Sequence, residues 1–285
     1  MNCGGVEASP AGLSALVSGL KLRSVECALR VNRTLRFNRV APVSPLVSAT
    51  VRGLAGTLLT SLHPEFTRRW FKPGQGNHRP AAFLIETLAH QVVASDLFPF
   101  RIRTWDPVGD LLPALVEALK QAPGRPFGDG GARVESVLFG EIQEGLADGE
   151  NICCLRQPTI EFLTPLRLKA SCRFLDEREV TLGHLTEAAV RRLNRLSLDY
   201  GNRSTLAETP LLAASAKVRE TTRSLCWERV WRHSSSQNTY IDLSGVAGRI
   251  TFAELPTLLT ELLRAASVVH IGHKTAEGCG QFRLS

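Results

Sequence analysis

The chain has 285 residues, of which 44% are apolar and 21% are charged, and its net charge is +7. This length and apolar content suffice for two domains that each bury a core. No run approaches 18 consecutive apolar residues, and no basic run precedes the short apolar stretch at 12–20, so we expect neither a membrane span nor a signal peptide.

The cysteine and arginine content narrows the class of protein further. Seven cysteines without a C-x-x-C pair suit disulfides poorly, so we expect a cytoplasmic protein with reduced, mostly buried thiols. His, Cys, Asp and Glu show neither the spacing of a zinc site nor that of a divalent-metal nuclease, and we predict no metal and no cofactor. Arginine outnumbers lysine 28 to 6. Guanidinium groups bind phosphate and stack on bases, so this bias favours a nucleic-acid partner, although a GC-rich genome also enriches arginine.

The first half opens with an alternating segment. Apolar residues take most odd positions of 25–37 and polar residues most even ones, which predicts a half-buried strand. The later elements of this half are, in order, a helix over 47–62, strands at 82–88 and 98–105, a helix over 110–122, a glycine turn at 128–133 and a strand at 134–139.

The second half repeats this order. Its elements are a strand at 160–173, a helix over 182–198, strands at 226–231 and 239–252, a helix over 254–266, a glycine turn at 278–283 and a strand at Leu284. Both glycine turns fit G-x-G-x-x-R, which indicates a duplicated module. An extra helix is predicted over 205–225 in the second half.

We therefore predict an α+β fold with two tandem ferredoxin-like, RRM-like βαββαβ modules. The first domain spans 20–145 and the second 158–285. The second carries a basic helical insertion at about 199–225 and a glycine-rich loop at 270–283.

The C-terminal loop is the densest candidate site. Gly272, Gly278 and Gly280 would let backbone amides approach a ligand closely, and His273, Lys274 and Arg283 would supply charge. A tight turn that joins the last helix to the last strand explains the same residues. The phosphate-loop likeness of 272–275 lacks the required glycines, so we do not expect nucleotide hydrolysis.

Four segments resemble one family. Gly245-Val-Ala-Gly-Arg-Ile-Thr-Phe252 and Val269-His-Ile-Gly-His-Lys-Thr-Ala-Glu-Gly-Cys-Gly-Gln-Phe-Arg-Leu284 resemble the C-terminal signature of the CRISPR repeat-RNA processing endoribonucleases. These enzymes belong to the RAMP (repeat-associated mysterious protein) superfamily. Ser48-Ala-Thr-Val-Arg-Gly-Leu-Ala-Gly56 is similar to that family's first helix, and Phe162-Leu-Thr-Pro-Leu-Arg-Leu-Lys169 to the entry of its second domain.

The resemblance implies an activity. Such enzymes bind the hairpin of a CRISPR repeat and cut the precursor RNA at its base, without metal. The 2′-hydroxyl attacks the adjacent phosphate and leaves a 2′,3′-cyclic phosphate and a 5′-hydroxyl. Many members keep the mature crRNA and join other effector-complex subunits, so we expect those partners, no membrane, and one protein monomer on one RNA.

The histidines depart from the family's pattern. The family often uses a histidine near the start of the first helix, but 30–62 contains none. His63 is better explained as a helix C-cap, His78 lies in a glycine-rich loop, and His270 is expected to end a strand in the core. His273 is the best-placed histidine.

We accordingly expect an arginine-assisted or His273-assisted site between the two modules. Arg23, Arg36 and Arg39 would position the 2′-hydroxyl and neutralise the phosphorane. Arginine would not act as the base, because its pKa above about 12 keeps the guanidinium protonated.

RNA binding is assigned to the basic residues of the second half. Arg191, Arg192 and Arg195, with the basic helix that follows, would lie along an RNA stem, which proteins read by shape and phosphate contacts. A solvated basic helix face is the alternative. The predicted RNA-contacting residues are Arg52, Arg191, Arg192, Arg195, Arg203, Lys217, Arg219, Arg223, Gly272, Lys274, Gly278, Gly280 and Arg283.

Two other functions fit the sequence. A catalytically inactive RAMP subunit would bind the crRNA end without cutting it, and the missing histidine favours this possibility. A basic two-module RNA-binding protein unrelated to CRISPR requires the C-terminal resemblance to be accidental.

Overall fold

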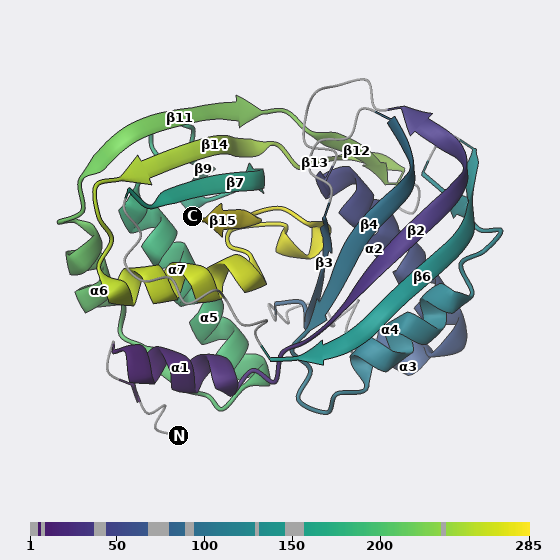
Figure 1. Cartoon of the computed structure of the whole chain (residues 1–285), viewed down its shortest axis with the longest axis horizontal. Coiled ribbons are helices and arrows are strands. Elements are labelled where there is room, and N and C mark those ends of the chain that lie inside the picture. The colour runs from purple at the N-terminus through teal and green to yellow at the C-terminus, as the bar shows by residue number, and fades with distance from the viewer. Residues whose placement is uncertain are drawn as a thin grey trace. The chain divides into compact units, whose positions relative to one another are not determined.

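The computed structural model in Figure 1 describes residues 5–6, 9–36, 44–67, 80–88, 94–128, 131–145, 157–234 and 238–285. The chain forms two compact units. The N-terminal module comprises Lys21–Ala147 and Ala276–Gly278, and the C-terminal module comprises Met1–Leu20, Asp148–Thr275 and Cys279–Ser285. None of the described helices is long and apolar enough to span a membrane.

The N-terminal module follows the predicted βαββαβ order. Its elements are β2 (Arg23–Arg36), α2 (Ser44–Leu62), α3 (Pro64–Phe66), β3 (Phe83–Thr87), β4 (Ala94–Thr104), α4 (Leu111–Lys120), β5 (Pro126–Phe127) and β6 (Ala132–Glu144). The antiparallel sheet has the order β3-β4-β2-β6-β5, in which the first four strands show the ferredoxin-like arrangement. Helices α2 and α4 pack on each other and on this sheet.

Local sequence explains the main elements of this module. The alternation in β2 buries Val25, Cys27, Leu29 and Val31, which confirms the predicted strand. Helix α4 begins where the Asp106 carboxylate accepts hydrogen bonds from three successive backbone N–H groups at residues 109–111. Those N–H groups have no partner inside the helix, so the carboxylate stabilises its start.

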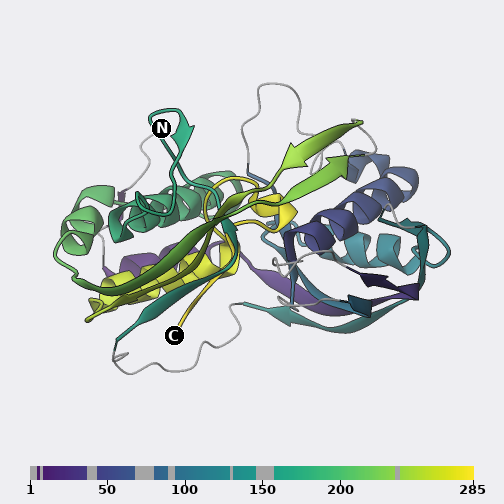
Figure 2. The same ribbon diagram turned by 90° about the horizontal axis from the view of Figure 1, so that it is seen from above.

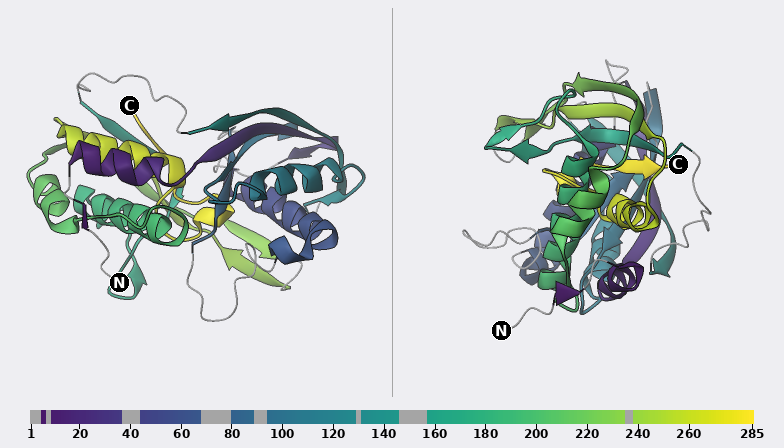
Figure 3. Two further views of the ribbon diagram at one scale, coloured as in Figure 1. Left: turned by 90° about the horizontal axis from the view of Figure 1, so that it is seen from below. Right: turned by 90° about the vertical axis from the view of Figure 1, so that its left-hand side faces the viewer.

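The C-terminal module repeats the order. Its main elements are α1 (Pro10–Ser18), β7 (Thr159–Leu166), α5 (Leu182–Tyr200), α6 (Glu208–Ser215), β11 (Glu220–Glu228), β12 (Trp231–Ser234), β13 (Thr239–Asp242), β14 (Gly245–Phe252), α7 (Thr257–Val269) and β15 (Phe282–Leu284). The sheet order β11-β14-β7-β15 again matches the ferredoxin-like arrangement, so the predicted pair of modules is confirmed. Helix α5 packs on α7, and α1 lies beside α7 (Figure 3).

The C-terminal module also contains three pairs of short strands outside its main sheet. The pairs are β1 (Gly5–Val6) with β10 (Thr205–Leu206), β8 (Lys169–Ala170) with β9 (Arg173–Phe174), and β12 with β13. The predicted strand at 160–173 therefore ends at Leu166. Ser171 and Cys172 have positive φ and turn the chain between β8 and β9.

The predicted helical insertion is wrong over much of its length. Only Glu208–Ser215 is helical, while Glu220–Glu228 forms the edge strand β11, paired along β14. The run Glu220-Thr-Thr-Arg-Ser-Leu-Cys-Trp-Glu228 contains β-branched threonines, and it gains ladder hydrogen bonds from β14 that an isolated helix could not offer. Tertiary pairing thus overrides the local basic-helix pattern.

Two further boundaries differ from the prediction. The expected strand 239–252 is interrupted, because the Asp242 carboxylate accepts the Ser244 N–H at 2.8 Å and the chain turns between β13 and β14. His270 is fully buried as expected, but it ends helix α7 rather than a strand, with a φ of 55°.

Candidate functional site

The C-terminal module contains a cavity of about 270 Å³. It gathers five residues that the sequence had singled out, three from α5 and two from the glycine-rich loop. The lining residues are Leu168, Lys169, Leu175, His184, Glu187, Ala188, Arg191, Arg192, Arg195, Gly272 and His273. Basic side chains dominate this lining, which suits an anionic ligand.

Two arginines of α5 present exposed guanidinium groups to the cavity. Arg191 pairs with Glu187, and the Nε of Arg195 lies 2.7 Å from a carboxylate oxygen of Asp199, each pair four residues apart on the helix. The Arg191 and Arg195 side chains are 67% and 50% exposed, whereas their partners Glu187 and Asp199 are 31% and 13% exposed. Both guanidinium groups are therefore accessible to a phosphate while each keeps its carboxylate partner.

Arg192 has a different environment. Its Nε donates to the Val269 carbonyl at 3.2 Å, at the C-terminal end of α7, and burial lowers its pKa to about 10. A cation is favourable at this helix end. Arg192 thus joins α5 to α7 and also lines the cavity.

His273 lies at the rim, on the glycine-rich loop. Its backbone N–H donates to the Arg167 carbonyl at 2.8 Å, and its ring meets that of Phe174 edge-on with centroids 5.7 Å apart. Partial burial and the positive charges of Lys169, Arg167 and Lys274 lower the pKa of the imidazole. The ring is consequently neutral at pH 7 and has a lone pair that can accept a proton.

Phe174 organises the cations beside His273. The Arg167 guanidinium lies 4.3 Å and the Lys169 ammonium 4.9 Å from the centre of its ring. Arg167 is buried, donates to the Ser244 carbonyl and lies 3.5 Å from the Asp242 carboxylate. Cation–π contact fixes Arg167 and Lys169 close to the imidazole.

His184 is a cavity residue that the sequence reading missed. It is the third residue of α5, and Thr181 caps the helix: the Thr181 hydroxyl accepts the His184 N–H, and His184 Nδ1 accepts the Thr181 N–H, both at 3.3 Å. Because Nδ1 accepts, a neutral His184 carries its proton on Nε2. The segment Thr181-Leu-Gly-His184 has the spacing of a capping box, with histidine in place of Glu or Gln. This pattern is the sequence signal that would have placed His184 at the start of a helix.

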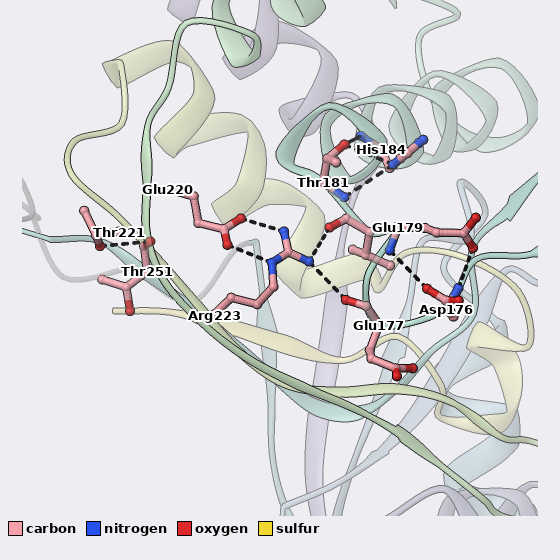
Figure 4. A network of polar contacts seen from close by, with 10 residues as sticks. Asp176, Glu177, Glu179, Thr181, His184, Glu220, Thr221, Arg223 and Thr251 are labelled. Atoms are coloured by element: carbon pink, nitrogen blue, oxygen red, sulfur yellow. Dashed lines mark hydrogen bonds and ion pairs between the residues drawn. The ribbon is translucent and has the colours of Figure 1, made fainter.

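Arg223 supports the segment that carries this cap (Figure 4). Its guanidinium pairs with Glu220 and donates to the carbonyls of Glu177 and Val180 at 3.0 and 2.8 Å. The latter two belong to the segment just before Thr181. Arg223 therefore fixes the start of α5 rather than extending from a helix toward RNA.

The remaining residues of the predicted basic helix are dispersed. Arg203 follows α5 with a φ of 65°, Lys217 follows α6, and Arg219 precedes β11; all three are exposed. Since they occupy separate turns, the expected helical projection bearing Arg203, Lys217, Arg219 and Arg223 does not exist. For each of these residues separately, contact with RNA stays a prediction.

The three loop glycines have structural reasons. A Cβ atom would lie 2.6 Å from the Arg167 carbonyl oxygen at Gly272, 2.6 Å from the Ser48 Cβ at Gly278, and 1.8 Å from the Ile271 carbonyl oxygen at Gly280. All three have positive φ. The loop also includes a 3₁₀ turn, η2 (Thr275–Glu277).

Several loop amides are engaged within the protein. The N–H groups of Cys279, Gly280 and Gln281 donate to Lys274, Pro165 and Thr164 respectively. These amides are not free to bind a ligand, whereas Gly272 lines the cavity. A role of Gly278, Gly280 and Lys274 in RNA binding stays a prediction. Arg283 pairs with Glu161 across the sheet and keeps a 63% exposed side chain.

Three predicted residues of the N-terminal module, Arg23, Arg36 and Arg52, occupy different places in the fold. Arg23 donates to the Gly109 carbonyl and pairs with Glu144, both at 2.8 Å, which gives it a structural role. Arg52 lies on α2 over the Phe83 ring. Arg36 ends β2, where its backbone pairs with Ala94. Arg39 and His78 lie outside the described residues.

His63 behaves as a structural histidine. It follows α2 directly, and its ring lies 3.2 Å from the Glu117 carboxylate and 3.6 Å from that of Glu65. Its backbone N–H donates to the Leu59 carbonyl at 2.7 Å. These contacts agree with the predicted role at the helix end.

Comparison with known families identifies the segment that holds the cavity. Residues 160–282 match the family model described as CRISPR-associated endoribonuclease Cas6. The predicted family resemblance is confirmed. Every lining residue of the cavity falls inside this Cas6-like segment.

Solved structures extend the likeness in fold to nearly the whole chain. The Cas6 (TTHB231) product complex is 18% identical with a TM-score of 0.59, and covers 93% of this chain and 99% of its own. Thermus thermophilus Cas6 (TTHB231) is 15% identical with a TM-score of 0.55, over 93% and 98%. The Cas6 (TTHA0078) product complex is 21% identical with a TM-score of 0.52, over 92% and 99%. No curated protein matches the sequence significantly.

Proposed function

We propose that this protein binds the hairpin of a CRISPR repeat and cuts the precursor RNA at the base of the hairpin. One observation carries the proposal: the cavity lies entirely within the Cas6-like segment and gathers Arg191, Arg195 and His273. A cation-rich hollow beside a neutral imidazole suits an RNA phosphate that is to be cleaved.

The proposed chemistry uses the 2′-hydroxyl of the RNA as nucleophile. Its oxygen attacks the adjacent phosphorus while the bond from phosphorus to the 5′-oxygen breaks. His273 takes the proton of the 2′-hydroxyl, and a water molecule gives a proton to the leaving 5′-oxygen. The products are a 2′,3′-cyclic phosphate and a 5′-hydroxyl. Since the nucleophile is part of the RNA and the proposed base is a side chain, this reaction requires no metal ion.

Charge placement supports the same assignment. Negative charge develops on the phosphorane oxygens, and Lys169, Arg191 and Arg195 line the cavity where they would offset it. Arg23, Arg36 and Arg39, which the sequence had suggested for this task, stay predictions. We further propose that the protein acts as a monomer and retains the cut RNA for other effector subunits.

A catalytically inactive RNA-binding subunit is the second candidate function. The observation that favours it is the complete lack of histidine in 30–62, where the family often has one. In that case the cavity would hold an RNA phosphate without cutting beside it.

One experiment separates the two functions. Purified protein is incubated in EDTA with a labelled repeat hairpin, beside the same RNA with a single 2′-deoxy substitution at each candidate position. We expect cleavage that one particular deoxy substitution abolishes, with a cyclic phosphate on the upstream product. Tight binding without cleavage would establish the inactive subunit, and cleavage that EDTA abolishes would contradict the metal-independent chemistry.

A further inference from the structure

Strands β12 and β13 form a two-stranded ribbon that pairs with no other described strand. We call it the aromatic ribbon. Figures 1 and 2 show it continuing from the ends of β11 and β14, beyond the sheet of the C-terminal module. Its register places Trp231 opposite Asp242 and His233 opposite Tyr240. Directly opposite residues of an antiparallel pair share a face, so these four side chains lie together.

This face exposes two large rings. Trp231 is 54% and Tyr240 71% exposed, whereas Trp105 in the N-terminal module is fully buried. Trp231 and Tyr240 are diagonal neighbours in the ladder, and the His233 ring meets the Tyr240 ring edge-on at 5.3 Å. A two-stranded ribbon has no hydrophobic core of its own for these rings to pack against. The adjacent exposed rings therefore form a surface on which a flat ligand can stack.

The fourth residue of this face joins the ribbon to the cavity. Asp242 lies 3.5 Å from Arg167, and the Arg167 carbonyl accepts the His273 N–H at 2.8 Å. One buried residue therefore holds both the base of the ribbon and the proposed catalytic histidine. Asp242 lies on the same face of the ribbon as Trp231 and Tyr240. Its contact with Arg167 therefore fixes the position of this face relative to His273.

The surrounding charge distinguishes the possible ligands. Arg167 offsets the Asp242 carboxylate, and Lys169 and Lys274 add positive charge beside His273. Exposed rings on a ribbon that Asp242 joins to the basic cavity fit a ligand that alternates stackable bases with phosphates, which is single-stranded nucleic acid.

We propose that Trp231 and Tyr240 stack on unpaired bases of the bound RNA, adjacent to the phosphate held in the cavity. The ribbon thereby selects a hairpin that has a single-stranded flank over one that lacks it. The position next to the cut rests on the proposed function, whereas the binding of unpaired RNA does not.

The test uses the full-length protein and two labelled probes, an unstructured RNA of about eight nucleotides and a blunt hairpin without flanks. Affinity is measured by fluorescence anisotropy across a series of salt concentrations. We expect Trp231→Ala and Tyr240→Ala each to weaken binding of the unstructured RNA roughly tenfold. Blunt-hairpin affinity should stay unchanged, which also verifies that the variants are folded.

Ring-retaining and matched variants refine the result. Trp231→Phe and Tyr240→Phe should largely restore binding, because phenylalanine still stacks. The salt slope should be the same in the alanine variants as in the wild type, since rings neutralise no phosphate. Leu138→Ala, at a residue of the N-terminal module that is 65% exposed, is the control for loss of an exposed apolar side chain.

Other outcomes would overturn the inference. Equal loss of both probes in the alanine variants would mean a general structural defect, and undiminished binding of the unstructured RNA would exclude stacking. Self-association of the wild type that Trp231→Ala abolishes, seen by sedimentation, would assign the ribbon to a second copy instead. Absence of RNA cleavage with stacking intact would contradict the proposed enzymatic function alone.

Discussion

The two glycine turns share the pattern G-x-G-x-x-R and the same place in their modules, but their surroundings differ. At Gly128 a Cβ atom would meet nothing within 4 Å, whereas at the equivalent Gly278 it would lie 2.6 Å from the Ser48 Cβ, and at Gly280 it would lie 1.8 Å from the Ile271 carbonyl oxygen. Gly128 therefore has open space around it, and the second turn is closely packed at both of its glycines. The duplicated pattern therefore marks a common topology, and only the second copy has been elaborated into a candidate site.

The largest effect should distinguish the histidines of the two modules. We expect His273→Ala to slow cleavage of the repeat hairpin roughly 10²–10⁴-fold, because it removes the proposed general base. His63→Ala, which removes a ring paired with Glu117 in the N-terminal module, should cleave at nearly the wild-type rate. Equal rates for both variants would remove His273 from the mechanism.

The pH profile of the same two proteins tests the difference between these histidines further. Burial and neighbouring cations lower the His273 pKa, so the ring stays neutral as the pH falls to its ordinary value of about 6.5. Cleavage should decline only below that pH, as protonation removes the base. This acidic limb should persist in His63→Ala and disappear in His273→Ala.

The next largest effect concerns the two glycine turns directly. Gly280→Ala should lower the free energy of unfolding by about 3 kcal/mol or more, since it adds a backbone clash to an unfavourable positive φ. Gly128→Ala incurs only the cost of its φ of +67°, about 1–2 kcal/mol. Urea denaturation measures both, and similar losses would refute the contrast in packing.

A smaller effect should separate the exposed arginines of the two modules. The double variant Arg191→Ala/Arg195→Ala should flatten the salt dependence of hairpin binding by about two units of slope, one for each guanidinium that no longer neutralises a phosphate. Arg30→Ala is the matched control, because Arg30 is 48% exposed and pairs with Asp96 on the N-terminal sheet. An unchanged slope in the double variant would show that α5 does not contact the stem.

The smallest effect is expected for the motif arginines themselves. Arg283 pairs with Glu161 at the surface, and Arg133 donates to the Gly124 carbonyl at 2.6 Å. Replacing either by alanine should change the free energy of unfolding by less than about 1 kcal/mol, because water screens both contacts. Arg283→Ala should still reduce the salt slope of RNA binding by about one unit, and Arg133→Ala should not.

The two βαββαβ modules could be predicted from the amino-acid sequence. Period-2 alternation in 25–37 and helical spacing in 47–62 and 182–198 report which side chains face a core, and that information is local. The grouping of Arg191 and Arg195 on one exposed helix face follows from the same periodicity. The C-terminal motif also indicated the resemblance that the Cas6 family model finds over residues 160–282.

The composition of the candidate site, in contrast, depends on the three-dimensional packing of the module. His184 enters the cavity because Thr181 caps α5, and the aromatic ribbon faces Arg167 through Asp242. The basic helix expected around Arg223 became an edge strand because β14 offers it a ladder of hydrogen bonds. Such contacts join residues that are distant in the chain, and no local pattern encodes them, since a side chain's neighbours depend on how the whole module packs.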